Sequence, residues 1–199
     1  MDNKKIIFVG PVGAGKTSAI QAVSEIDCVN TEAKISVDEV KSHKSTTTVA
    51  IDYGRVTTDA NEKAHLYGAP GQSRFDFMWD MLSEEIAHDA SGVVLMLDNA
   101  RECPQEDLKY YLNAFSRLIK DRQLVVGVTR SDVQANPSLD DYQQWLADLG
   151  IEASVTFVDA RDRSAVFALV EPLLGPLTRA ASAMGVSVGA SGEQGVATV

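Results

Sequence analysis

The sequence predicts a single α/β domain with a doubly wound, mostly parallel sheet. Apolar, strand-like runs alternate along the chain with amphipathic, helix-like segments, as in parallel strands that are joined by crossover helices. Two of the runs, 93–97 and 124–128, are apolar throughout, which is typical of strands buried on both faces. A chain of 199 residues is long enough to bury the core of one such domain.

Six strands and five helices are expected. The strands are 6–9, 47–53, 64–67, 93–97, 124–128 and 155–158. The helices are 16–25, 75–89, 105–120, 139–149 and 164–174. The second and third strands follow each other with no helix between them. We therefore expect them to form a hairpin, which gives the sheet one antiparallel edge strand.

The domain is expected to span 1–177 and to be followed by a flexible tail, 178–199. The segment 180–199 holds one charged residue, four glycines and no aromatic residue, so it lacks the apolar surface that would order it. The net charge of −10 argues against a general affinity for nucleic acid or for an anionic membrane. The N-terminus does not resemble a signal peptide, and we expect a cytoplasmic protein without direct membrane insertion.

The stretch "GPVGAGKT", 10–17, fits the phosphate-loop pattern G-x-x-x-x-G-K-[ST] in full. It follows a strand-like run and opens a helix-like segment, which is the context that this pattern requires. Backbone N–H groups of 13–17 are expected to wrap the phosphates, Lys16 to neutralise the terminal two, and the Thr17 hydroxyl to bind Mg²⁺. The predicted nucleotide contacts in this phosphate loop are Gly10, Val12, Gly13, Ala14, Gly15, Lys16, Thr17 and Ser18.

Two later stretches, "VVGVTRSD" (125–132) and "FVDARD" (157–162), supply candidate contacts to a base. The Asp132 carboxylate can accept hydrogen bonds from the N1–H and the exocyclic amine of guanine, and Arg130 can cover the face of the base. Each stretch alone is an ordinary loop, but both follow strands, where ligands of such sheets gather. The predicted residues on the base side are Thr129, Arg130, Asp132, Asp159, Ala160 and Arg161.

With these motifs in this order, residues 4–175 resemble the Ras-like small GTPases, and most closely the bacterial MglA-like branch that pairs with roadblock-domain proteins. The resemblance implies a P-loop NTPase fold of the Ras-like G-domain type, with GTP or GDP bound and Mg²⁺ as cofactor. In that family a threonine of the first switch binds Mg²⁺. The segment "KSTTTVAIDYG", 44–54, resembles this switch. Thr48 matches best, and Thr46 and Thr47 are rival candidates.

The second switch of the family carries D-x-x-G-Q, which here reads "GAPGQ", 68–72. The resemblance implies that Gly71 senses the γ-phosphate through its N–H group and that Gln72 orients the attacking water, with Lys16 as the third catalytic residue. Gly68 stands where the family has the aspartate that holds Mg²⁺, usually through water. Its loss predicts slow hydrolysis. Val12 adds to this if its side chain crowds the terminal phosphate, whereas the loop can also simply bend around it.

The helix-like segment after Gln72 carries a second apolar face beside its core stripe. The core stripe is formed by Phe75, Trp79, Leu82 and Ile86, and the second face by Phe77, Met78 and Met81. We interpret the second face as a docking surface for a roadblock-type regulator or effector. The alternative is that a neighbouring helix covers it.

Three functions are compatible with these motifs, and a GTP-binding molecular switch with slow hydrolysis is preferred. A non-catalytic scaffold that binds GTP or GDP is the first alternative, which the missing carboxylate at Gly68 favours and the retained Gln72 opposes. A P-loop phosphotransferase or ATPase is the second alternative. Its Mg²⁺-binding aspartate would be Asp98, at the end of the apolar run "VVLMLD".

Overall fold

The structure is a computed structural model that describes residues 4–37, 45–58, 63–71, 90–120 and 122–174, with the backbone alone for 29–37 and 45–50. The strands are β1 (Lys4–Val9), β2 (Val29–Val37), β3 (Ser45–Thr57), β4 (Lys63–Gly68), β5 (Gly92–Asp98), β6 (Gln123–Thr129) and β7 (Ser154–Phe157). The helices are α1 (Lys16–Val23), α3 (Pro104–Ala114), α4 (Ser116–Ile119), α5 (Leu139–Asp148) and α6 (Arg163–Val170), followed by a 3₁₀ turn η3 (Glu171–Leu174). The expected helix 75–89 and the expected tail 178–199 lie outside the described residues.

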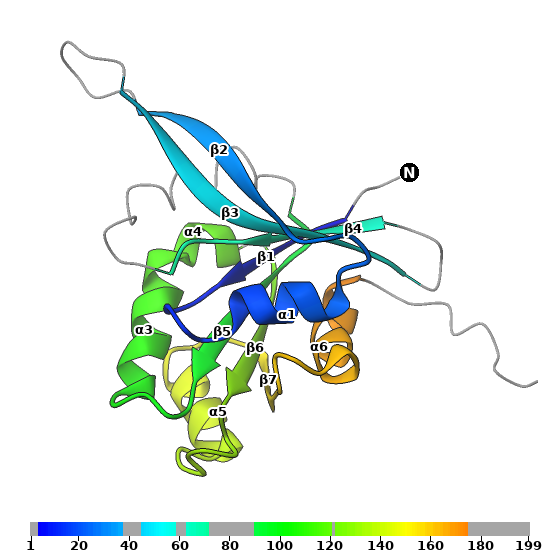
Figure 1. Ribbon diagram of the computed structural model, residues 1–199. Coiled ribbons are helices and arrows are strands. Elements are labelled where there is room, and N and C mark those ends of the chain that lie inside the picture. Colours follow the sequence, from blue (N-terminus) through cyan, green and yellow to red (C-terminus); the bar gives the residue numbers. More distant parts are fainter. Residues whose placement is uncertain (1–3, 38–44, 59–62, 72–89, 121, 175–199) are drawn as a thin grey trace, which may run out of the picture.

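The strands form one sheet in the order β2-β3-β4-β1-β5-β6-β7 (Figure 1). The central strand β1 pairs in parallel with β4 and β5, and β6 and β7 continue the parallel sheet. The strand β3 is antiparallel to both of its neighbours, β2 and β4. The predicted α/β class, the mostly parallel sheet and the hairpin of β3 and β4 are therefore confirmed.

The prediction of six strands with β3 at the edge needs one correction. A seventh strand, β2, pairs with the outer edge of β3 and is itself the edge strand. In the run "VNTEAKISV", mostly apolar residues alternate with polar residues. This alternation is the pattern of an edge strand with one solvated face. This pattern was present in the sequence and was overlooked. Residues 45–51 of β3 pair only with β2, so the β2–β3 hairpin projects beyond β4. Figure 1 shows this projection.

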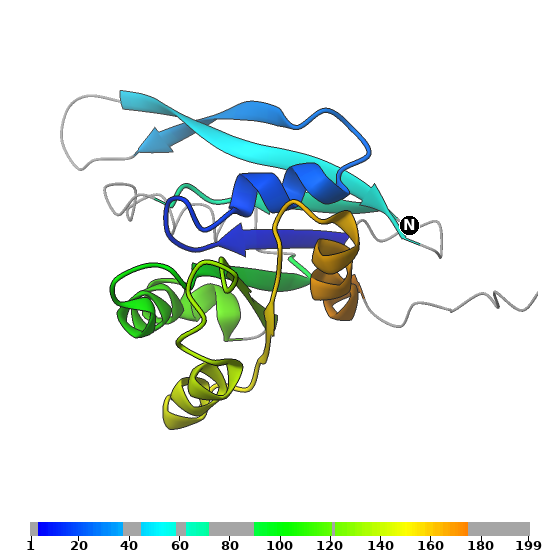
Figure 2. The ribbon, with the colours of Figure 1, turned by 60° about the horizontal axis from the view of Figure 1, so that its bottom comes forward.

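Two apolar cores lie on opposite faces of the sheet. Alternate residues of β1 belong to different cores, with Ile7 and Val9 in one and Ile6 and Phe8 in the other. Side chains of α3, α4 and α5 fill the first core, and side chains of α1 and α6 fill the second. Figure 2 shows the hairpin of β2 and β3 above β1 and the helix α5 below it. The chain is thus doubly wound, as the sequence predicted.

Two of the expected helices differ from the structure in detail. The expected helix 105–120 is divided at Phe115 into α3 and α4, and the Phe115 side chain is buried between them and the sheet. The expected helix 164–174 ends as the 3₁₀ turn η3. None of the described helices is long and apolar enough to cross a membrane.

A buried hydrogen-bond network joins the end of β5 to α5. Asn99 and Tyr142 are both fully buried, and the Tyr142 hydroxyl donates to the Asn99 side-chain oxygen at 2.8 Å. The Asn99 amide donates to the backbone oxygens of Gln134 and Pro137 at 2.6 and 3.1 Å. This network fixes the loop that follows β6, because its donors and acceptors satisfy one another away from water.

Replacing Tyr142 by Phe is expected to lower the free energy of unfolding by about 1–3 kcal/mol, because a buried oxygen of Asn99 loses its donor. Urea denaturation measures this change. The variant Asn99→Ala should also be destabilised, and the double variant should cost less than the sum of the two, since both changes remove the same bond. Strictly additive losses would show that the bond contributes nothing.

Candidate functional site

The phosphate loop links the end of β1 to the first turn of α1, as the sequence predicted. Gly15 precedes the helix with φ of 93°, in the left-handed region that favours glycine. A Cβ on Gly15 would lie 2.9 Å from the Cβ of Ala160, so a larger residue would push this loop away from the loop after β7. Ala14 is buried, while Val12 is 53% exposed. The Val12 side chain is therefore directed largely to solvent in this arrangement.

Lys16 is buried beneath the phosphate loop. Its ammonium donates to the backbone oxygens of Gly10 at 2.7 Å and Pro11 at 2.8 Å. Burial lowers the pKa of Lys16 to about 8, and the nearby negative charge of Asp52 acts in the opposite direction. A poorly hydrated ammonium held in this way is suited to neutralise an incoming phosphate, because the anion supplies the charge compensation that water does not.

Gly71 lies directly against the phosphate loop. A Cβ on this residue would come within 2.6 Å of the Lys16 ammonium and 2.7 Å of the Val12 backbone nitrogen. The hydroxyl of Tyr111, on α3, donates to the Gly71 backbone oxygen at 2.8 Å. Gly71 is thus held beside the buried ammonium of Lys16. Gln72 lies outside the described residues.

Thr129, at the end of β6, ties the base-side loop to the phosphate loop. Its hydroxyl lies 3.2 Å from the Ala14 backbone oxygen and 3.0 Å from the Leu97 backbone oxygen, and the residue is buried. The sequence suggested a direct nucleotide contact. The geometry adds a bracing role, because this one hydroxyl lies against both the neighbouring strand β5 and the phosphate-loop residue Ala14.

Arg130 follows Thr129 in a left-handed conformation, with φ of 59°. Its guanidinium forms an ion pair with the buried carboxylate of Asp98 at 2.6 Å. The other carboxylate oxygen of Asp98 accepts from the backbone N–H of Ala100 at 2.9 Å. Asp98 therefore acts as the counter-ion that orients Arg130 across one side of the site.

The loop after β7 brings Asp159, Ala160 and Arg161 to the same place. The Arg161 guanidinium donates to both carboxylate oxygens of Asp159 at 2.9 Å, and its backbone N–H donates to the same carboxylate. These bonds lower the pKa of Asp159 to about 2, and the hydrogen bonds from the Arg161 side chain are the largest cause. The pKa of Arg161 is raised, mainly by its hydrogen bonds to Asp159, and the negative charge of Asp132 adds to this. Ala160 is buried against Gly15.

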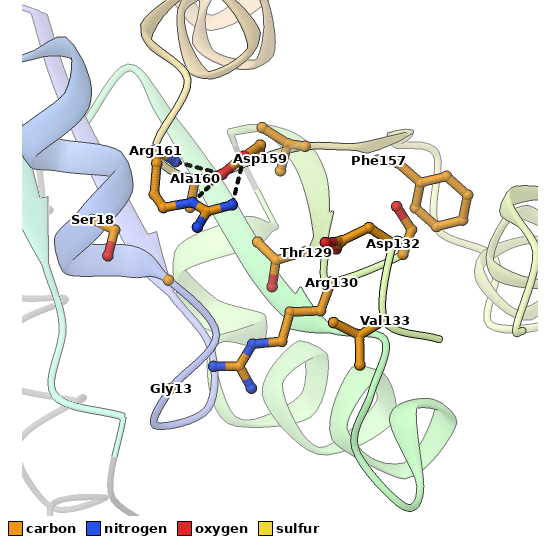
Figure 3. A pocket seen from close by; sticks show the side chains of 13 residues that line it. Gly13, Ser18, Thr129, Arg130, Asp132, Val133, Phe157, Asp159, Ala160 and Arg161 are labelled. Atoms are coloured by element: carbon orange, nitrogen blue, oxygen red, sulfur yellow. Dashed lines mark hydrogen bonds and ion pairs between the residues drawn. The ribbon is translucent and has the colours of Figure 1, made fainter. Parts of the chain in front are cut away.

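These three loops enclose a cavity of about 520 Å³ (Figure 3). Predicted site residues that line it are Gly13, Gly15, Ser18, Thr129, Arg130, Asp132, Asp159, Ala160 and Arg161. Lining residues that the sequence reasoning missed are Ser131, Val133, Phe157 and Val158. The last two lie at the end of the expected strand 155–158, in the stretch "FVDARD", but were not chosen as contacts. Figure 3 shows Arg130 and the Asp159–Arg161 pair on different sides of Asp132.

Asp52 is a further residue that the sequence reasoning did not single out. The Thr17 hydroxyl donates to its carboxylate in a short hydrogen bond. Asp52 lies on β3, directly opposite Gly68 of β4 in the strand register. The only signal in the sequence was its position shortly after the threonine run of the first-switch segment.

Thr46, Thr47 and Thr48 lie farther out on β3, where they pair with β2. Thr48 precedes Asp52 by four residues, which places the two backbones about 13 Å apart along an extended strand. The assignment of a metal-binding role to Thr48 stays a prediction, and in this arrangement Asp52 lies beside Thr17 instead. The predicted docking residues Phe77, Met78 and Met81 lie outside the described residues.

Comparison with known proteins identifies a family of nucleotide-binding proteins to which the chain is similar. The family model described as "Conserved hypothetical ATP binding protein" matches residues 8–171. The chain is also 29% identical over 128 residues to an uncharacterised protein of Methanocaldococcus jannaschii, an alignment that covers 64% of this chain and 68% of that protein. The family match spans the phosphate loop and both base-side loops. The chain therefore belongs to this family of conserved ATP-binding proteins, a nucleotide-binding family of the P-loop type.

Proposed function

We propose that this protein is a GTP-binding molecular switch that hydrolyses GTP slowly, of the Ras-like type and related to the MglA-like branch. One observation carries the proposal. The phosphate loop, the Thr-Arg-Ser-Asp loop after β6 and the Asp-Ala-Arg loop after β7 enclose one cavity of about 520 Å³ at the carboxyl ends of parallel strands. This is the place where nucleotides bind in open α/β sheets.

The base chemistry of the cavity favours guanine, although the family description names ATP. Asp132 lines the cavity, and a carboxylate there can accept hydrogen bonds from the N1–H and the exocyclic amine of guanine. Adenine carries an unprotonated N1, which a carboxylate repels. Arg130, fixed by Asp98, can cover the base, and the buried Thr129 keeps this loop at a constant distance from the phosphate loop.

The phosphate end supports a switch. Lys16 and the first turn of α1 are suited to bind the phosphates, and the N-cap residue of this helix is Gly15, which has no side chain to cap it. The Thr17 hydroxyl would hold Mg²⁺ with the phosphate oxygens, and the ion would neutralise their charge. Gly71 rests against Lys16 and Val12, so a terminal phosphate must either bind its N–H group or displace it. Such a contact couples the nucleotide to the second-switch segment.

Gln72 follows Gly71, and we assign it the orientation of the attacking water. The face of Phe77, Met78 and Met81 is proposed to dock a roadblock-type regulator or effector. We propose slow hydrolysis because Gly68 removes the Ras-like carboxylate from this position, so that a carboxylate for Mg²⁺ must come from another part of the chain. The alternative of an ATPase that uses Asp98 for Mg²⁺ is disfavoured, since both of its carboxylate oxygens are engaged by Arg130 and Ala100.

Competition between GTP and ATP for the purified protein tests base selection. GTP is expected to bind more tightly, and Asp132→Asn should weaken GTP by about 10- to 100-fold, because the amide keeps one acceptor but loses the charge-assisted hydrogen bond from the exocyclic amine, worth about 1.5–3 kcal/mol. The variant should bind xanthosine triphosphate better, since the amide can donate to the extra carbonyl. Asp140→Asn, an exposed carboxylate on α5, is the control. Preference for ATP, or no effect of Asp132→Asn, would contradict guanine recognition.

Single-turnover release of phosphate from GTP with Mg²⁺ tests the catalytic part. The wild type is expected to release phosphate slowly, and Gln72→Leu should lower the rate at least about tenfold, because the attacking water loses its orienting group. Gln143→Leu, at an exposed position of α5, serves as the matched control. Tight GTP binding without any phosphate release, even with a partner, would instead identify a non-catalytic scaffold.

The bracing role of Thr129 gives a third test. Thr129→Val keeps the shape of the side chain but removes the hydroxyl between the Ala14 and Leu97 oxygens. Affinity for GDP is expected to fall about tenfold, which corresponds to about 1.4 kcal/mol, since the base-side loop is no longer fixed to the phosphate loop. Thr129→Ser keeps the hydroxyl and should bind nearly as well as the wild type. Isothermal titration calorimetry of all three proteins makes the comparison, and equal affinities would contradict it.

A further inference from the structure

The carboxylate of Asp52 is the strongest feature near the phosphate end that the proposed function leaves unexplained. It accepts a hydrogen bond from Thr17 Oγ1, the hydroxyl expected to bind Mg²⁺. Its charge also acts on the buried ammonium of Lys16. The two side chains that are expected to meet the phosphates and their metal ion therefore share one acidic neighbour, which comes from a different strand.

The strand register explains why this carboxylate fits here. Asp52 of β3 lies opposite Gly68 of β4. A Cβ on Gly68 would come within 3.0 Å of the Asp52 Cβ and 3.2 Å of its carboxylate oxygen. A larger residue at position 68 would thus crowd Asp52. The absence of a side chain at Gly68 makes room for the carboxylate that the neighbouring strand supplies.

Electrostatics adds a second argument. A carboxylate beside a phosphate site repels the phosphate unless a cation lies between the two charges. Mg²⁺ in nucleotide sites is commonly held by one or two carboxylates, a hydroxyl and phosphate oxygens. The Thr17 hydroxyl and the Asp52 carboxylate are two hard oxygen ligands in contact with each other, so a shared ion would turn a repulsive neighbour into a ligand set.

We propose that Asp52 holds the nucleotide-associated Mg²⁺ together with Thr17, directly or through a bound water, and so replaces the carboxylate missing at Gly68. This inference rests on the proposed nucleotide-binding function and deepens it. The metal ligand moves from the second-switch segment to β3, the strand that carries the projecting hairpin with β2. Release of the ion then removes a link between the phosphate loop and β3.

The variant Asp52→Asn tests the proposal, because it keeps the size of the side chain and removes its charge. Dissociation of fluorescent mant-GDP is followed over a Mg²⁺ titration, and Mn²⁺ bound to the protein–GDP complex is measured by electron paramagnetic resonance. Asp52→Asn is expected to lower the affinity of the protein–GDP complex for Mg²⁺ and Mn²⁺ about 10- to 100-fold. With excess EDTA its GDP affinity should equal or exceed that of the wild type, which also shows that the variant is folded.

Asp27→Asn is the matched control, because Asp27 is exposed and, like Asp52, has a charge that acts on Cys28. It should behave as the wild type does. If Asp52→Asn keeps wild-type Mg²⁺ and Mn²⁺ affinities, the proposal is overturned, while guanine nucleotide binding stands. The same titration with mant-ADP separates the selection of guanine from the role of Asp52 in metal binding. Metal-dependent binding of ADP alone would overturn guanine selection and still test Asp52, and binding of neither nucleotide would overturn both proposals.

Discussion

Parallel pairing of β1 with β5, β5 with β6 and β6 with β7 is the constraint on which the site depends. It brings the carboxyl ends of these strands to one edge, so loops that are far apart in the sequence meet there. Contacts between the loops then set their spacing. Gly15 allows Ala160 to approach, and the Thr129 hydroxyl lies between the Ala14 and Leu97 oxygens. The cavity keeps its shape because these contacts are buried.

An acidic protein that binds a nucleotide must place its positive charge locally. The chain carries a net charge of −10, yet Lys16, Arg130 and Arg161 converge on the site. Asp98 orients Arg130, and Asp159 orients Arg161. The ion pairs fix the direction of each guanidinium and leave Lys16, whose ammonium binds only backbone oxygens of Gly10 and Pro11 among the described contacts, to meet the phosphates. Direction and burial, rather than overall charge, make this edge suited to an anion.

The strand β3 connects the phosphate end to the outermost hairpin. Its inner half pairs with β4 and carries Asp52, and its outer half pairs only with β2. Gly71, which lies against the phosphate loop, accepts a hydrogen bond from Tyr111 of α3. The phosphate end therefore touches two separate elements. Under the proposed switch function, a change in the bound nucleotide would act on both through short contacts.

The sequence by itself determined the α/β class, the phosphate loop and the two base-side loops, because each depends on local patterns of apolar runs, glycines and turn residues. The alternation of β2 is also a local pattern of this kind. The tertiary structure alone decided that Thr129 braces two loops, that Asp98 serves Arg130, and that Asp52 lies beside Thr17. These contacts join residues 32 to 115 positions apart. Such residues meet only when the sheet is assembled with its helices and loops, and a local pattern in the sequence does not specify contacts over these separations.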